Sequence, residues 1–324
     1  MSAAGRRAPG TAGAPLLLVT VGLAAALVCP LVASTYTIRL ATGIFMFGAL
    51  ACGWNLIGGY AGYPDFGAAA FLGLGAYTTG ILMLRLRLPF AVALLAGAAL
   101  AAATATAMGA ILLRLRGHYF AIATLGFMLV LQQLASNLEI TGGGSGMNLP
   151  VARSFTAFYF WMLGVLVLAV TAGAVLPRIR VGYAIAAIRE NQDAAQALGV
   201  TPLPHKILAY AGSAIVFGTV GGIYAYWFTF IDPPTVFDVD FAIQAIVMTL
   251  FGGPGTAMGP LIGAIILKVL DTALTNVSVF FHNVFFGALV CLLAIFAPRG
   301  LAELFRARSG LLRAVAAQLR ESRL

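Results

Sequence analysis

Long apolar runs, separated by short polar or glycine-rich segments, fill most of this sequence. A helix of about 20 apolar residues crosses a bilayer because all of its backbone groups are hydrogen-bonded within the segment. The runs do not alternate apolar with polar positions, which disfavours a transmembrane β-barrel. The pattern therefore predicts an all-α integral membrane protein with about ten transmembrane helices, some of them broken or re-entrant. The expected spans lie near residues 14–33, 37–57, 66–84, 89–113, 119–137, 158–176, 206–228, 240–252, 258–280 and 283–297.

Both ends of the chain carry basic residues outside the apolar runs. Arg6 and Arg7 precede the first run. That run is longer than the apolar core of about 7–15 residues in a secretory signal, so it is interpreted as the first span. The predicted organisation is a cytoplasmic N-terminal tail at 1–14, a polytopic transmembrane domain at 15–298 and a basic cytoplasmic tail at 299–324.

A polar segment at 177–206 interrupts the apolar sequence. Within it, RVGYAIAAIRENQDAAQALG at 180–199 has the pattern of an amphipathic helix, which we expect over 183–199 with an end at Gly199. A polar helix gains nothing from the bilayer, so we expect it to face water and to contact a protein. A solvated loop helix is the plainer alternative. The contact interpretation indicates a membrane subunit driven by a soluble partner.

Charge sets the expected orientation. The net charge is +9, but the basic residues stand in short groups beside apolar runs, which is typical of cytoplasmic loops and not of nucleic-acid binding. Residues 177–206 are therefore expected in the cytoplasm, and residues 138–156 and 229–239 outside, where the latter segment is acidic. Arg85 and Arg87 fall on the outer side, which makes 66–84 the weakest of the predicted spans.

Two glycine-rich segments, at 58–77 and 252–264, are expected to break helices. Broken helices in two halves of a membrane protein often mark a transport path, and small residues also allow plain close packing of helices. Asp65 is the charged exception, with a role either at a substrate amine or as a helix cap. The candidate path residues are Asn55, Gly59, Gly62, Asp65, Gly67, Gly73, Gly75, Gly252, Gly253, Gly255 and Gly259.

Lys268 and Asp271 are charged residues within an apolar run. They stand three positions apart, so they share one helix face. Charges inside a membrane span are costly, and they usually pair or line a water-filled cavity. The two residues are therefore expected to form an intramembrane polar pair, and contact with a substrate is the alternative.

The sequence lacks the motifs of catalytic chemistry. It has no phosphate-binding loop of the form G-x-x-x-x-G-K-[ST], and no Cys/His cluster has the spacing of a metal site. Only 9% of the residues are charged, against roughly 25% in soluble domains. We therefore expect a protein that is not an enzyme and that binds no metal or cofactor of its own. If ATP drives it, the ATPase is another chain.

Four stretches together resemble the permease subunits of branched-chain amino acid ABC importers, in particular the M-type subunit. They are NLIGGYAGYPDFGAAAFLGLGAY at 55–77, RLRGHYFAIATLGF at 114–127 followed by TGGGSGM at 141–147, the 180–199 stretch, and LFGGPGTAMGPLIGAIIL at 250–267. Their order and spacing match that family over nearly the whole chain. The chain departs from the family at Tyr63, Pro64, Asp65 and Ala68, where Gln, Leu, Ser and His are common.

The resemblance implies a permease domain in a bacterial inner membrane that forms a path with a second permease subunit. An extracytoplasmic substrate-binding protein would deliver the amino acid, and two cytoplasmic ATPase subunits, which hold ATP and magnesium, would drive it. Permeases for urea or short amides, and an ATP-independent transporter or channel, are the alternatives. The 183–199 helix would couple to the ATPase, with Ile185, Ile188 and Leu198 as an apolar stripe. The implied coupling residues are Arg180, Gly182, Ile185, Ile188, Arg189, Glu190, Asp193, Ala194, Ala195 and Gly199.

Overall fold

The computed structural model describes residues 26–28, 30, 34–150, 155–275 and 288. It is almost entirely helical, and two short strands, β1 (Met147–Asn148) and β2 (Phe230–Ile231), form one antiparallel ladder. The helices are α2 (Thr35–Trp54), α3 (Ala69–Arg85), α4 (Phe90–Leu112), α5 (His118–Asn137), α6 (Phe155–Val175), α7 (Arg180–Glu190), α8 (Gln192–Ala197), α9 (Pro202–Phe228), α10 (Pro233–Val236), α11 (Val239–Gly252) and α12 (Gly259–Thr275).

The predicted all-α class is confirmed, whereas the predicted count of ten membrane spans is not. Six of the described helical segments are long and apolar enough to cross a membrane, and α3 is a shorter apolar helix. The expected spans at 14–33 and 283–297 lie outside the described residues, apart from a few positions. Those at 89–113 and 119–137 agree with α4 and α5 to within a residue. The expected span at 206–228 begins four residues earlier, because Pro202 occupies the first turn of α9, a position where its missing N–H costs nothing.

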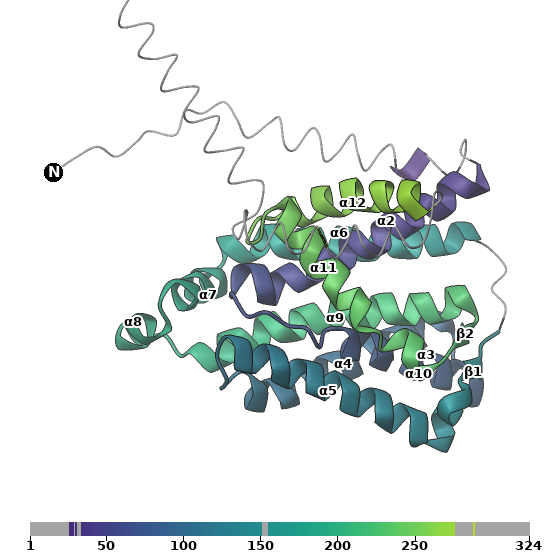
Figure 1. Ribbon diagram of the computed structural model, residues 1–324, viewed down its shortest axis with the longest axis horizontal. Coiled ribbons are helices and arrows are strands. Elements are labelled where there is room, and N and C mark those ends of the chain that lie inside the picture. The colour runs from purple at the N-terminus through teal and green to yellow at the C-terminus, as the bar shows by residue number, and fades with distance from the viewer. Residues whose placement is uncertain (1–25, 29, 31–33, 151–154, 276–287, 289–324) are drawn as a thin grey trace, which may run out of the picture.

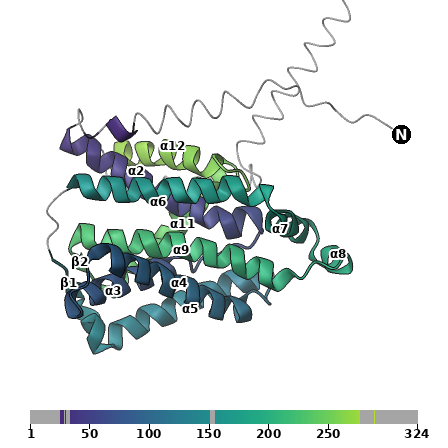
Figure 2. The same ribbon diagram turned by 180° about the vertical axis from the view of Figure 1, so that it is seen from behind.

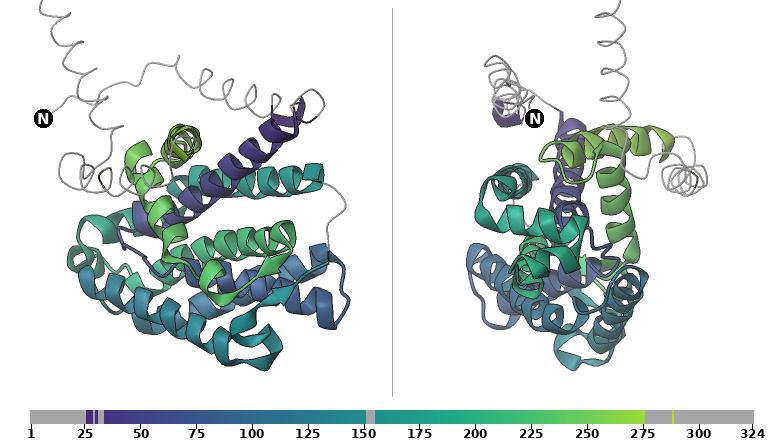
Figure 3. Two further views of the ribbon diagram at one scale, coloured as in Figure 1. Left: turned by 45° about the vertical axis from the view of Figure 1, so that its right-hand side comes forward. Right: turned by 90° about the vertical axis from the view of Figure 1, so that its left-hand side faces the viewer.

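Helices α2 and α9 form the centre of the molecule, and the other helices surround them (Figures 1 and 2). Helices α3 and α4 pack on α9, while α6, α11 and α12 pack on α2. Figure 3 shows α2, α6 and α12 on one side of the bundle and α5 on the other. The outer helices α4, α5 and α6 expose large apolar side chains along much of their length, as helices that contact lipid do.

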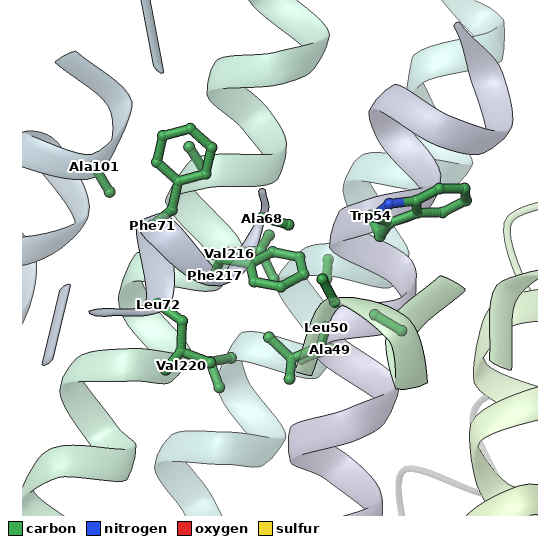
Figure 4. Close-up of a cluster of buried hydrophobic side chains, with 14 of the residues drawn as sticks. Ala49, Leu50, Trp54, Ala68, Phe71, Leu72, Ala101, Val216, Phe217 and Val220 are labelled. Carbon is green, nitrogen blue, oxygen red and sulfur yellow. The ribbon is translucent and has the colours of Figure 1, made fainter. Parts of the chain in front are cut away.

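The core lies where α2, α3 and α9 meet (Figure 4). Leu50 of α2, Phe71 of α3 and Phe217 of α9 are fully buried there. Phe71 also meets the ring of Tyr210 edge to face, with the centroids 5.2 Å apart, a favourable aromatic geometry. The large side chains fill the space between helices whose closest approaches are made by glycines.

Glycines set the distance between α3 and α9. A Cβ on Gly75 would overlap the carbonyl oxygen of Gly218, and a Cβ on Gly221 would overlap that of Leu72. In lipid no hydrophobic force drives helices together, so association depends on close packing of this kind. The structure therefore assigns a packing role to Gly75, which the sequence analysis had placed among the path candidates.

The two ends of the bundle carry different secondary structure. Helices α7 and α8 project from one end, whereas β1 and β2 lie at the opposite end (Figure 1). The strands join the loop after α5 to the loop after α9, since Met147 pairs with Ile231. Segments 138–156 and 229–239, both expected outside the membrane, are thus hydrogen-bonded to each other through β1 and β2. They lie at the opposite end of the bundle from α7 and α8 of the polar segment 177–206, which was expected inside.

The prediction of one continuous amphipathic helix over 183–199 is wrong. The segment is divided at Asn191, whose extended backbone separates α7 from α8. The side chain of Asn191 accepts hydrogen bonds from the backbone N–H groups of Asp193 and Ala194, both at 3.0 Å. Asn is a preferred N-cap residue because it satisfies these otherwise unpaired donors. The end at Gly199 is close to the prediction: Gly199 has φ +86° and follows the last turn of α8.

The glycine packing between α3 and α9 can be tested with a matched pair of substitutions. Gly75→Ala should destabilise the protein by about 1–3 kcal/mol, the usual cost of overpacking. Gly126→Ala in α5 is the control, because a Cβ there meets nothing within 4 Å, and alanine is the better helix former. Thermal unfolding in detergent, monitored by size-exclusion chromatography, measures the stability of both variants. Equal stability of the two variants would contradict the packing account.

Candidate functional site

The first helix break follows α2. The helix widens into a π-helical turn, Asn55–Tyr60, and the chain then runs without regular structure to residue 68 before α3 begins. The N–H of Tyr63 still reaches back to the carbonyl oxygen of Ile57, at 3.1 Å. Gly62 has φ +76°, a backbone conformation that residues with a side chain rarely adopt. The break predicted at 58–77 is therefore confirmed, and we call residues 55–68 the first break.

The second break, residues 253–258, separates α11 from α12. Gly253 and Gly255 have φ of +110° and +76°. The hydroxyl of Thr256 donates to the carbonyl oxygen of Gly253 at 2.8 Å and accepts from the N–H of Gly259 at 3.1 Å. This threonine therefore stabilises the turn and the start of α12. The sequence segment 252–264 correctly predicted the break.

Asn55 joins the two breaks directly. Its Nδ2 donates to the carbonyl oxygen of Thr256 at 2.9 Å, and its Oδ1 accepts from the N–H of Gly255 at 2.8 Å. A primary amide carries one donor side and one acceptor side, so it can pair with exposed backbone as another peptide group would. Asn55 is 1% exposed. Removing its side chain would leave two backbone groups in the break unpaired, which is costly in a buried site.

Arg189, near the end of α7, reaches the same junction. Its Nη1 donates to the carbonyl oxygen of Gly59 at 2.6 Å. A Cβ on Gly255 would lie 2.7 Å from this Nη1 atom, and a Cβ on Gly62 would lie 3.2 Å from the Cγ of Arg189. Gly62 of the first break and Gly255 of the second therefore make room for one arginine. The polar segment 177–206 is thereby linked to both breaks by a single side chain.

Lys206, in the second turn of α9, is a second inward-pointing cation. It is 3% exposed. Its Nζ donates to Tyr63 Oη at 2.9 Å and to the carbonyl oxygen of Leu113 at 2.6 Å. A longer bond of 3.3 Å reaches Gln192 Oε1, and the ammonium also lies 4.6 Å from the centroid of the Tyr63 ring. These contacts connect the first break, the end of α4, α8 and α9.

An exposed ion pair also holds α8. Arg116, in the loop before α5, contacts Asp193 at 2.9 Å, and both side chains are more than half exposed. The hydrogen bond and the charge of Arg116 hold the pKa of Asp193 below its usual value. Exposed pairs of this kind contribute little stability. The pair shows that Asp193, one of the implied coupling residues, contacts a residue of its own chain.

The expected apolar stripe on the coupling region is wrong in part. Ile185 and Ile188 are buried, and they face the core of this chain. Leu198 is the exposed member, at 84%. Of the remaining coupling candidates, Gly182 and Ala195 are also buried, so they position the helices. Those on the surface are Arg180, Glu190, Asp193, Ala194 and Gly199, together with part of Arg189.

The other path candidates are packed against this chain. A Cβ on Gly67 would overlap the carbonyl oxygen of Thr124, one on Gly73 would overlap the ring of Phe237, and one on Gly252 would overlap the carbonyl oxygen of Gly259. Gly59 and Gly255 belong instead to the junction around Asn55 and Arg189. Among the glycine candidates, Gly59, Gly62, Gly67, Gly253 and Gly255 lie in the two breaks, whereas Gly73, Gly75, Gly252 and Gly259 lie in helices.

Asp65 and the Lys268–Asp271 pair take structural positions. Asp65 is fully buried, and its Oδ1 accepts from the N–H of Gly67 at 2.9 Å just before α3. This bond closes a turn before α3, whose N-cap residue is Ala68 and not Asp65. Lys268 donates to Asp271, and its ammonium lies 4.4 Å from the centroid of the Phe47 ring. The predicted polar pair is therefore confirmed, and it lies between α12 and α2.

Sequence reasoning missed the residues that connect the polar segment to the breaks. Gln192 and Arg116 carry no signal of their own, since each is an ordinary residue in a loop or at a helix end, and Tyr63 stood out only as a departure from the family that the chain resembles. Lys206 does carry one: it is a lysine four residues into a long apolar helix, and a charge at such a place needs partners. Which partners it finds depends on the fold.

Comparison with known proteins identifies the family of the chain. A family model described as "Branched-chain amino acid transport system / permease component" matches residues 36–295. The chain is 29% identical over 318 residues to the high-affinity branched-chain amino acid transport system permease protein LivM of Escherichia coli (strain K12), which covers 88% of this chain and 74% of that protein. It is 26% identical over 303 residues to the probable LivM of Methanocaldococcus jannaschii, with 76% of this chain and 87% of that protein covered.

A more distant similarity covers part of the chain. The ribose import permease protein RbsC of Escherichia coli (strain K12) is 31% identical over 141 residues, which is 42% of this chain and 43% of that protein. No solved structure matches the chain. The family match, by contrast, spans both breaks and the whole polar segment 177–206. The chain therefore belongs to the family of permease components of branched-chain amino acid transport systems, and it is a LivM-like multi-pass membrane permease of the ABC transporter class and not an enzyme.

Proposed function

We propose that this protein is a permease subunit of an ATP-driven importer for branched-chain amino acids in the bacterial plasma membrane. It forms the translocation path with a second permease subunit. An extracytoplasmic binding protein delivers the substrate, and two cytoplasmic ATPase subunits bind ATP and magnesium and supply the energy. The observation that carries the proposal is Arg189, because one side chain of the projecting polar segment contacts both helix breaks.

The docking surface for the ATPase is the exposed side of α7 and α8. It contains Glu190 at the end of α7 and Leu198 after α8. Tyr183, on the outer face of α7, is 68% exposed. Charged residues flank these apolar groups, and the surface projects from the end of the bundle opposite to β1 and β2 (Figure 1). The β1–β2 end faces the binding protein in this proposal.

Arg189 gives the docking surface a route to the path. The guanidinium donates to a carbonyl oxygen in the first break and lies against Gly255 in the second. Helix breaks change conformation more readily than continuous helices, because fewer of their backbone hydrogen bonds fix them. A shift of α7 on ATP binding therefore moves both breaks together, with Asn55 holding them to each other.

The substrate assignment rests on the relatives. A branched-chain amino acid has an apolar body and a zwitterionic head. The partial charges of broken helix ends suit such a head. Urea or a short amide is the second candidate within the same class of importer.

Reconstitution tests the assignment. The complete complex in proteoliposomes should accumulate leucine, isoleucine or valine only when ATP and the binding protein are both present, because energy and substrate reach the permease through separate proteins. Urea uptake by the same vesicles measures the second candidate. Uptake that persists without the ATPase subunits would contradict the importer, and uptake of urea in preference to leucine would reassign the substrate.

Replacement of Arg189 tests the route from the surface to the breaks. Arg189→Ala should lower leucine uptake per ATP hydrolysed by about tenfold or more, because a hydrogen bond from a charged donor contributes about 1.5–3 kcal/mol. Assembly with the ATPase should be retained, since Tyr183, Glu190 and Leu198 of the docking surface are unchanged. Arg178→Ala, which removes an exposed arginine just before α7, is the control. An unchanged ratio of transport to hydrolysis in Arg189→Ala would rule out this role.

Charge reversal at Glu190 tests docking itself. Glu190→Lys places a positive charge on the exposed end of α7 and should uncouple ATP hydrolysis from transport while membrane insertion stays normal. Co-purification of the ATPase subunits and leucine uptake are measured in the same preparations. Normal uptake together with normal ATPase association in this variant would show that the end of α7 is not part of the docking surface.

A further inference from the structure

The buried ammonium of Lys206 has no place in the docking or path assignments made above. Of the residues that the structure describes, Asp65, Lys206 and Asp271 are the buried charged side chains. Asp65 caps a turn, and Asp271 pairs with Lys268. Lys206 instead donates to three neutral oxygen atoms. A buried charge without an opposite charge is costly unless its hydrogen bonds are fully satisfied, so its position is determined by these three partners.

The three partners come from three separate elements. Leu113 is the C-cap residue of α4, and its carbonyl oxygen lies in the last turn, where helical carbonyls lack partners within their own helix. Gln192 is the first residue of α8. Tyr63 lies in the first break, and its hydroxyl donates to Gln192 Oε1 at 2.9 Å. Lys206, Tyr63 and Gln192 therefore form a closed triangle of hydrogen bonds.

Helix α8 is short and is bounded by non-helical residues on both sides. It follows the extended residue Asn191 and ends before Gly199, where a Cβ would meet nothing within 4 Å. A helix of six residues does not hold its position by its own hydrogen bonds. The triangle at its first residue and the exposed Arg116–Asp193 pair therefore fix α8 to the rest of the chain, and the triangle is the buried one of these two attachments.

We propose that Lys206 is a positioning residue that ties α8 to the first break through Tyr63 and Gln192, so that a displacement of α8 is transmitted to residues 61–68. This inference rests on the proposed function, because the displacement would come from the docked ATPase. It adds a second connection to the one made by Arg189. Arg189 connects α7 to the junction of both breaks, whereas Lys206 connects α8 to the first break alone.

The attachment of α8 can be measured on the isolated permease. A nitroxide spin label at Leu198 reports the mobility of α8, and one at Tyr183 reports that of α7; both labels are placed in a background without Cys29, Cys52 and Cys291. Lys206→Met should make the label at Leu198 more mobile and leave the label at Tyr183 unchanged. Arg114→Met removes an exposed positive charge from the same end of the bundle and is the matched control.

Two substitutions of similar size at Gln192 separate positioning from a general packing effect. Gln192→Leu removes the acceptor for Lys206 and should raise the mobility at Leu198. Gln192→Glu gives Lys206 a carboxylate partner and should leave the mobility at Leu198 equal to that of the unmodified chain or lower. Both variants keep Lys206 in place, so they remain informative if Lys206→Met does not fold. Equal mobility of Gln192→Leu and Gln192→Glu would overturn the proposal.

The complete complex supplies the functional readout. Gln192→Leu should lower leucine uptake per ATP hydrolysed by about tenfold, the factor that corresponds to the loss of one hydrogen bond to a charged group, and Gln192→Glu should retain the ratio. A normal ratio in Gln192→Leu would also overturn the proposal. The mobility measurement needs no ATPase, so failure of the importer function and failure of the Lys206 connection are distinguishable.

Discussion

The reciprocal hydrogen bonds of Asn55 are the constraint on which the rest of this permease depends. They join two helix breaks that lie about 200 residues apart in the sequence. Each break exposes backbone groups that a continuous helix would satisfy. In an apolar bundle such groups need partners from the protein itself. One buried amide supplies both a donor and an acceptor, and this holds the end of α2 against the loop between α11 and α12.

Arg189 and Lys206 connect the two breaks to the end of the bundle that carries α7 and α8. Arg189 donates to the carbonyl oxygen of Gly59 and occupies the space that Gly62 and Gly255 leave open. The glycines in the breaks thus have a specific neighbour, a side chain of the coupling segment, and their small size is required by that contact. Lys206 makes an analogous contact with Tyr63. The polar segment 177–206 is therefore both a surface element and a part of the interior of the permease.

The sequence predicted the helical class, most helix positions, both breaks and the Lys268–Asp271 pair. These features have local causes: apolar runs of spanning length, glycines at positive φ, and charges spaced on one helix face. The prediction of an apolar contact stripe was wrong in part because it concerned a surface. Periodicity marked Ile185 and Ile188 as one face of a helix, and that face covers this chain's own core. The Asn191 break was also missed, since asparagine is compatible with both a helix interior and a cap.

Contacts between residues far apart in the sequence could not be predicted from the sequence. Nothing near Asn55 indicates Thr256, and nothing near Lys206 indicates Tyr63 or Gln192, because these contacts arise only when α2, α8 and α9 are packed. The sequence analysis named Tyr63 as a departure from the family that the chain resembles. In this chain that tyrosine is the partner of a buried lysine, so the departure belongs to the connection between the first break and α8.

A double-mutant cycle between Arg189 and Asn55 tests the central claim most directly. The claim is that both residues act through one junction of the two breaks. Leucine uptake per ATP hydrolysed is measured for Arg189→Ala, Asn55→Leu and the combined variant in the assembled complex. Residues that act through one network show strong non-additivity, so the combined variant should be no more defective than the worse single variant. Defects that multiply independently would contradict the account.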